Sequence, residues 1–138
     1  MKAASREALA SVEFKLDQFL ASDNAVASAA QAGLDLFEVV DVLDTDRELR
    51  VALTDAAVPA DTRKSLVQNL FGSKIAPIAA QVIEAAAAEQ WSSTRDLVKG
   101  LVSLGRRALL RGAEAQGQLG QVEDELFRLS SILKNEAE

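Results

Sequence analysis

Residues 93–116 read STRDLVKGLVSLGRRALLRGAEAQ, and they predict a long helix. Apolar residues recur at steps of three and four, which is the period of an amphipathic helix. The segment Ser93–Asp96 forms a capping box, a pattern typical of a helix start. Each glycine in a helix interior costs up to about 1 kcal/mol relative to alanine. We therefore expect Gly100, Gly105 and Gly112 to serve close helix packing or a break.

The same helical period extends over nearly the whole chain, and strict alternation of the kind found in strands never lasts. Apolar stripes predict further helices around residues 4–21, 34–44, 49–53, 66–71, 77–90 and 119–133. Residues 25–33 are rich in alanine and weakly patterned. Thr45 to Glu48 read as a second capping box with Thr45 as the cap. The pattern predicts an all-α fold, a bundle of six to seven helices.

Composition excludes several classes of function. The 138 residues contain no His and no Cys, which removes zinc fingers, thiolate nucleophiles, Ser-His-Asp triads and disulfides. The net charge is −6, and this acidic balance argues against a general nucleic-acid binder. The first residues lack the apolar core of a secretory signal, and residues 75–88 are too short and too polar to span a bilayer.

Two parts of the chain are similar to each other. Residues 6–9, Arg-Glu-Ala-Leu, match residues 106–109, Arg-Arg-Ala-Leu. We interpret residues 1–104 as one complete helical unit, and residues 105–138 as the first helices of a second, truncated unit that continues from the long helix 93–116. Chance alignment of two amphipathic helices is the alternative explanation.

Residues 105–135, GRRALLRGAEAQGQLGQVEDELFRLSSILKN, resemble the opening of the delta subunit of F-type ATP synthases, called the oligomycin-sensitivity-conferring protein in mitochondria. Residues 78–91 resemble the fifth helix of that family. The family's P-x-x-x-K turn is matched by Pro59, with Lys64 slightly beyond the usual place. Two features depart from the family pattern: its Arg after the fifth helix comes late here, as Arg95, and the doubled unit resembles only some actinobacterial members.

The resemblance implies a non-catalytic stator component, part of the peripheral stalk that links the catalytic head to the membrane sector. It implies a six-helix domain that holds the N-terminal helix of an alpha subunit in a groove between its first and fifth helices. It also implies a separate C-terminal domain, missing from this chain, that holds a b-type stalk. The expected location is peripheral, at the cytoplasmic face of the cell membrane, without membrane insertion and without a catalytic, cofactor or metal site.

The first and fifth helical stretches supply the candidate partner-binding residues. These are Leu9, Val12 and Leu16 on the first, and Ile78, Val82 and Ala86 on the fifth. The same residues fit plain core packing, which any helical bundle requires. Arg107 and Arg111 are four residues apart, share a helix face, and belong to a basic segment, 95–111. That segment fits either an acidic partner surface or a solvated helix face.

Trp91, the only Trp in the chain, fits either a core anchor or a partner contact. The acidic runs at residues 44–46 and 123–125 are typical of a helix start and an exposed helix face rather than a metal site. Because capping boxes and apolar stripes suit any helical protein, an unrelated helical adaptor or regulator stays as the alternative function. We expect the apolar stripe Leu119–Leu133 either to pack back on the first unit or to form a dimer.

Overall fold

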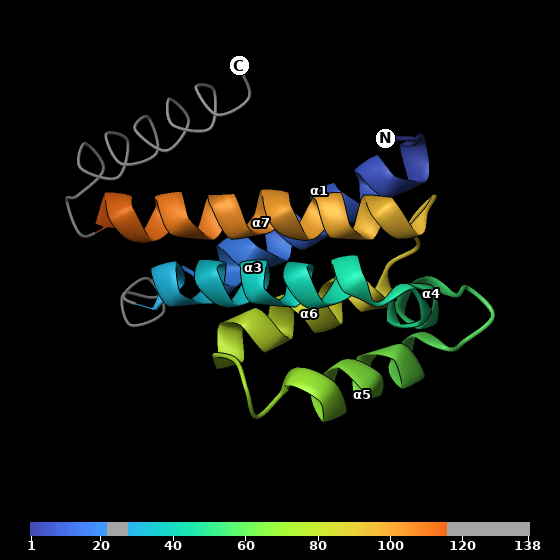
Figure 1. Cartoon of the computed structure of the whole chain (residues 1–138). Helices are drawn as coiled ribbons and strands as arrows, with labels where there is room; N and C mark the ends of the chain where they lie inside the picture. Colours follow the sequence, from blue (N-terminus) through green and yellow to red (C-terminus); the bar gives the residue numbers. More distant parts are fainter. Residues whose placement is uncertain (22–27, 116–138) are drawn as a thin grey trace, which may run out of the picture.

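The computed structural model describes residues 1–21 and 28–115, which form six helices and no strand. The helices are α1 (Ala3–Phe19), α3 (Ala29–Thr45), α4 (Arg47–Thr54), α5 (Ala60–Phe71), α6 (Pro77–Ala88) and α7 (Thr94–Ala115) (Figure 1). The predicted all-α fold is confirmed for this part of the chain. The predicted helix at 119–133 and the acidic run 123–125 lie outside the described residues. Among the described helices, none has the length and apolar character needed to cross a bilayer.

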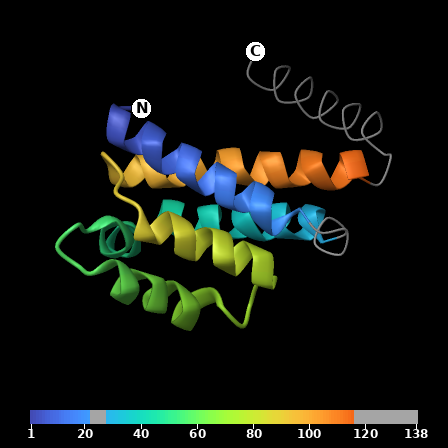
Figure 2. The same ribbon diagram turned by 180° about the vertical axis from the view of Figure 1, so that it is seen from behind.

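The longest helix, α7, lies side by side with α3 (Figures 1 and 2). Glycines bring the two backbones together. A Cβ atom added to Gly33 would lie 2.7 Å from the carbonyl oxygen of Gly105, and one added to Gly112 would lie 2.9 Å from the backbone nitrogen of Ala30. A Cβ added to Gly100 would meet the Trp91 ring at 2.7 Å. The prediction that these glycines serve close packing is therefore confirmed.

Two sequence predictions of local structure were wrong. The helix expected from residue 34 begins at Ala29, so residues 29–33 are helical despite their weak pattern. Tertiary packing overrides the poor helix propensity of Gly33, because only glycine fits against α7 there. The N-cap of α4 is Asp46 rather than Thr45: the Asp46 carboxylate accepts a hydrogen bond from the backbone N–H of Leu49 at 3.0 Å. Thr45 is instead the last residue of α3.

Three other helix ends agree with the sequence predictions. Pro77 occupies the first turn of α6, where its missing N–H costs nothing. The Ser93 hydroxyl accepts a hydrogen bond from the backbone N–H of Asp96 at 3.2 Å, as expected for the start of α7. Gly72 follows α5 as its C-cap.

The core lies around α6, which packs against α1, α3, α5 and α7. Figure 2 shows α1 crossing in front of α7 above α6, while α5 lies below α6. Each of the six helices contributes to the largest fully buried side chains, which include Leu16, Leu36, Leu53, Val67, Ile83 and Leu101. The helical period of the sequence therefore placed the core stripes correctly.

The predicted division between residues 104 and 105 falls inside α7. This helix continues through the division without a break, and Ala108 and Ala113 are buried beyond it. Of the second unit, residues 105–115 are described, and they form part of the same bundle as the first unit. The division into two units remains a prediction.

Candidate functional site

The α1–α6 pair contains six of the eight candidate partner-binding residues, and the structure places most of them in the core. Val12, Leu16, Val82 and Ala86 are fully buried, whereas Leu9 and Ile78 are partly buried and pack against the core. These side chains hold the two helices together. The four buried ones are therefore not accessible to a partner, which would contact residues on the outer sides of α1 and α6 that are at least partly exposed.

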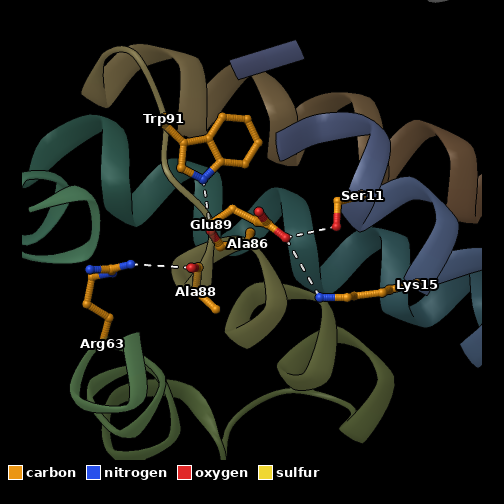
Figure 3. Close-up of polar contacts among 7 residues, drawn as sticks. All are labelled: Ser11, Lys15, Arg63, Ala86, Ala88, Glu89 and Trp91. Atoms are coloured by element: carbon orange, nitrogen blue, oxygen red, sulfur yellow. Dashed lines mark hydrogen bonds and ion pairs between the residues drawn. The ribbon is translucent and has the colours of Figure 1, made fainter. Parts of the chain in front are cut away.

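The last turn of α6 is held by side chains from outside the helix (Figure 3). The Trp91 indole donates from Nε1 to the carbonyl of Ala86 at 2.8 Å. The buried Arg63 of α5 donates from Nε to the carbonyl of Ala87 at 2.6 Å and from Nη2 to that of Ala88 at 3.3 Å. The last carbonyls of a helix have no partner within the helix, so the donors of Arg63 satisfy those of Ala87 and Ala88. A cation there also interacts favourably with the negative end of the helix dipole.

Arg63 also holds the segment that precedes its own helix. Its Nη1 donates to the carbonyl of Asp55 at 3.0 Å and to that of Val58. The guanidinium thus joins the loop before α5 to the end of α6. Its chemistry suits this role, because one planar group presents five N–H donors in fixed directions.

Glu89, the residue that follows α6, links this end to α1 (Figure 3). Its Oε1 accepts a hydrogen bond from the Ser11 hydroxyl at 2.8 Å and lies 3.7 Å from the Lys15 ammonium. Nearer the start of α1, the buried Ser5 hydroxyl accepts from the backbone N–H of Ser92 at 2.7 Å. The helices α1 and α6 therefore run antiparallel, with the end of α6 fixed to α1 by polar contacts.

The outer side of α1 carries a large exposed apolar side chain. Phe14 is 65% exposed, the most exposed of the large apolar residues in the described part of the chain. It lies three residues after Ser11 and four before the exposed Gln18, so the three share one side of the helix. Gln81 of α6 is also exposed. We call Ser11, Phe14, Lys15, Gln18, Ile78 and Gln81 the α1–α6 face.

Arg107, one of the two basic candidates, is occupied within the chain. Its guanidinium holds the Asp17 carboxylate with two bonds of 3.0 and 2.7 Å and lies 3.6 Å from Glu13. These hydrogen bonds hold the pKa of Asp17 below its ordinary value, and the charges of Arg107 and Arg111 act in the same direction. The same bonds raise the pKa of Arg107. The second basic candidate, Arg111, is exposed.

Trp91 lies in the core, 8% exposed, so the core interpretation holds for it. Arg63 and Glu89, which hold the end of α6, were not among the residues predicted from the sequence. Arg63 stands four residues after Pro59, which is the spacing of the P-x-x-x-K turn, so spacing could have identified it. Glu89 follows an apolar helix and carried no comparable signal.

Within residues 1–21 and 28–115, no three carboxylates converge as a metal site requires. Two surface pockets of this region lie away from the α1–α6 face. A pocket of about 320 Å³ between α3, α4 and α5 is lined by apolar side chains such as Val42 and Leu70 and by the charged Glu38, Asp46 and Lys74. A pocket of about 250 Å³ lies where α4 and the start of α7 meet the end of α3.

Comparison with known proteins identifies the relatives of this chain. It is 68% identical over 138 residues to the ATP synthase subunit delta of Corynebacterium aurimucosum, across 100% of this chain and 51% of the relative. The chain is homologous to ATP synthase delta subunits. The corresponding subunits of Corynebacterium glutamicum and Corynebacterium kroppenstedtii are 58% and 46% identical, over 99% and 98% of this chain and 51% and 50% of each relative.

The homology confirms the resemblance to the ATP synthase delta subunit. The chain spans about half the length of the curated relatives that it matches. No family model matches the chain. The relatives named ATP synthase subunit delta thus establish the homology over the whole chain, while the site residues rest on the geometry described above.

Proposed function

We propose that this chain is part of a non-catalytic subunit of an F-type ATP synthase and that it acts in the peripheral stalk. In this role it links the catalytic head to the membrane sector, at the cytoplasmic face of the cell membrane. The α1–α6 face binds the N-terminal helix of an alpha subunit. A b-type stalk subunit is bound by a part of the full-length protein that this chain does not include. The homology to delta subunits supports the proposal.

The observation that carries the binding proposal is the polar anchoring of the α6 end beside an exposed aromatic ring. Glu89 fixes α6 to α1 through Ser11 and Lys15, and Phe14 lies exposed next to Ser11. An amphipathic partner helix binds by placing its apolar side chains in a groove between two helices. A fixed helix pair favours this binding, because less conformational freedom is lost on association.

A stator contact must persist while torque is applied, so slow dissociation matters more than fast association. Aromatic anchors at an interface often dominate the binding energy. Phe14 is the aromatic side chain that the α1–α6 face presents, and Ile78 lies partly buried within the same face. We therefore assign the main energetic contribution to Phe14.

The proposal is tested by titrating the chain with a peptide of the N-terminal helix of the alpha subunit of Corynebacterium aurimucosum. NMR amide shifts are expected at Ser11, Gln18 and Gln81. Phe14→Glu is expected to weaken the affinity by about tenfold or more. The control is Leu34→Glu on α3, since Leu34 is a 50% exposed apolar residue away from this face. The proposal fails if the peptide does not bind, or if both substitutions weaken binding equally.

A further inference from the structure

A basic pocket of about 250 Å³ lies in the corner between α3, α4 and α7. It is lined by Asp44 of α3, Arg50 of α4, and Arg95, Val98 and Lys99 of α7. Three cations and one carboxylate therefore surround this space. The whole chain has a net charge of −6, so this corner is positive against an acidic background.

Arg50 is held in place by backbone groups. Its Nη1 donates to the carbonyl of Asp44 at 3.0 Å and to that of Leu43, which are both in the last turn of α3. Its Nε is buried and has no acceptor within the described residues. The guanidinium is thus fixed at the side of the pocket, and no carboxylate in residues 1–21 or 28–115 forms an ion pair with it.

Arg95 and Lys99 are exposed and have no ion pair or hydrogen bond within the described part of the chain. They are four residues apart on α7, so their side chains are neighbours on the helix surface. Like charges at this spacing are unfavourable for a helix. By contrast, Arg107 on the same helix forms ion pairs with two carboxylates of α1.

We propose that this pocket binds an acidic segment of a partner protein, with one Asp or Glu side chain inserted between Arg50, Arg95 and Lys99. A carboxylate in this position relieves the repulsion between Arg95 and Lys99 and forms charge-assisted hydrogen bonds, which are stronger than neutral ones. The partly buried Val98 supplies apolar contact for the stem of that side chain.

The surroundings favour an inserted side chain over an anionic membrane. Asp44, which lines the pocket, and the exposed Asp46 and Glu48 belong to the junction of α3 and α4. A membrane surface would bring anionic headgroups against these carboxylates as well as against the cations. Membrane recognition typically uses clusters of four to eight basic residues on one surface. A single side chain in the pocket meets three cations and one carboxylate, Asp44, among the lining residues.

The test is an NMR titration of the whole chain with the peptide Glu-Leu-Glu-Leu-Glu at low salt. Amide shifts are expected at Val98 and Lys99, together with weaker binding as salt is added. Arg95→Glu and Lys99→Glu are each expected to weaken binding by about tenfold. Arg106→Glu is the matched control, because Arg106 is an exposed cation of the same helix that does not line the pocket. It should bind as the unaltered chain does.

A second measurement separates binding from folding. Lys99→Gln should leave the thermal midpoint unchanged or slightly raised, because it removes a like-charge pair, while it reduces peptide binding. The proposal is overturned if Glu-Leu-Glu-Leu-Glu and Gln-Leu-Gln-Leu-Gln shift the spectrum equally, or if Arg106→Glu weakens binding as much as Arg95→Glu. It is also overturned if inorganic phosphate or phosphatidylglycerol vesicles bind at the pocket and the peptide does not. None of these outcomes bears on binding at the α1–α6 face.

Discussion

The α3–α7 and α1–α6 pairs are held together by opposite means. Between α3 and α7, glycines remove side chains, so that Gly33 and Gly105 bring backbone against backbone. Between α1 and α6, apolar side chains fill the space and polar groups such as Glu89 fix the helix end. At the first contact, a methyl group added to Gly33 would collide with the backbone of α7. The second pair leaves the side chains of Phe14 on α1 and Gln81 on α6 exposed.

The largest loss of stability is expected from the substitution of Arg63, since its side chain holds the end of α6. Arg63→Ala removes the side-chain donors to the carbonyls of Ala87 and Ala88 and opens a cavity. A loss of about 3 kcal/mol in the free energy of unfolding is expected, measured by urea denaturation. Lys64→Ala, at the exposed next position, should change stability by no more than about 0.5 kcal/mol. Equal losses in the two variants would refute the role of Arg63.

Gly33→Ala tests the α3–α7 contact directly. The new methyl group would lie 2.7 Å from the Gly105 carbonyl oxygen and 2.8 Å from the Leu109 side chain. Since the first neighbour is backbone, the helices must separate, and a net loss of about 1–3 kcal/mol is expected in spite of the better helix propensity of alanine. Leu34→Ala, on the exposed side of the same helix, is the control. A more stable Gly33→Ala protein would contradict the close packing.

Glu89→Gln separates the two contacts that Glu89 makes with α1, the hydrogen bond from Ser11 and the ion pair with Lys15. The amide retains an acceptor for the Ser11 hydroxyl but removes the charge that attracts Lys15. The ion pair is partly exposed, so the loss of stability should be no more than about 1 kcal/mol, and it should shrink as salt is added. Glu89→Ala should cost more, because the acceptor is lost too. A thermal denaturation series of both variants at two salt concentrations measures the difference.

The smallest loss of stability is expected from the ion pair between Asp17 of α1 and Arg107 of α7. Hydrogen bonds from Arg107 lower the pKa of Asp17 below its ordinary value of 3.8. The stabilisation from this pair is therefore present above that value and is lost as the pH falls through the lowered, folded-state pKa. Because both side chains are well exposed, Asp17→Asn should cost less than about 1 kcal/mol at neutral pH. The difference between the two proteins should vanish in acid, as measured by urea denaturation across a pH series.

The helical period of the sequence was sufficient to predict the core stripes, because burial of Val12, Leu16 and Val82 follows directly from spacing. It could not predict the helical start at Ala29, since that depends on the fit of Gly33 against a helix far away in the chain. Local rules likewise could not choose between Thr45 and Asp46 as the cap.

The candidate site was predicted less completely than the fold. Spacing identified the α1 and α6 stripes but not which residues remain exposed, and the exposed Phe14 was not selected. The contacts of Arg63 with α6 and of Glu89 with Ser11 join residues that are 24 to 78 positions apart, so they depend on the fold and no local pattern encodes them. The basic character of α7 was visible in the sequence, but only the structure separates Arg107, which is paired, from Arg95 and Lys99, which have no ion pair with the residues that it describes.

Hydrogen–deuterium exchange of the chain, alone and with the alpha-subunit peptide, tests whether the α1–α6 face binds the partner while α3 and α7 serve as the scaffold. We expect added protection in α1 and α6 on peptide binding, with the exchange of α3 and α7 unchanged. Added protection confined to α3 and α7, or no change in any helix at saturating peptide, would contradict it.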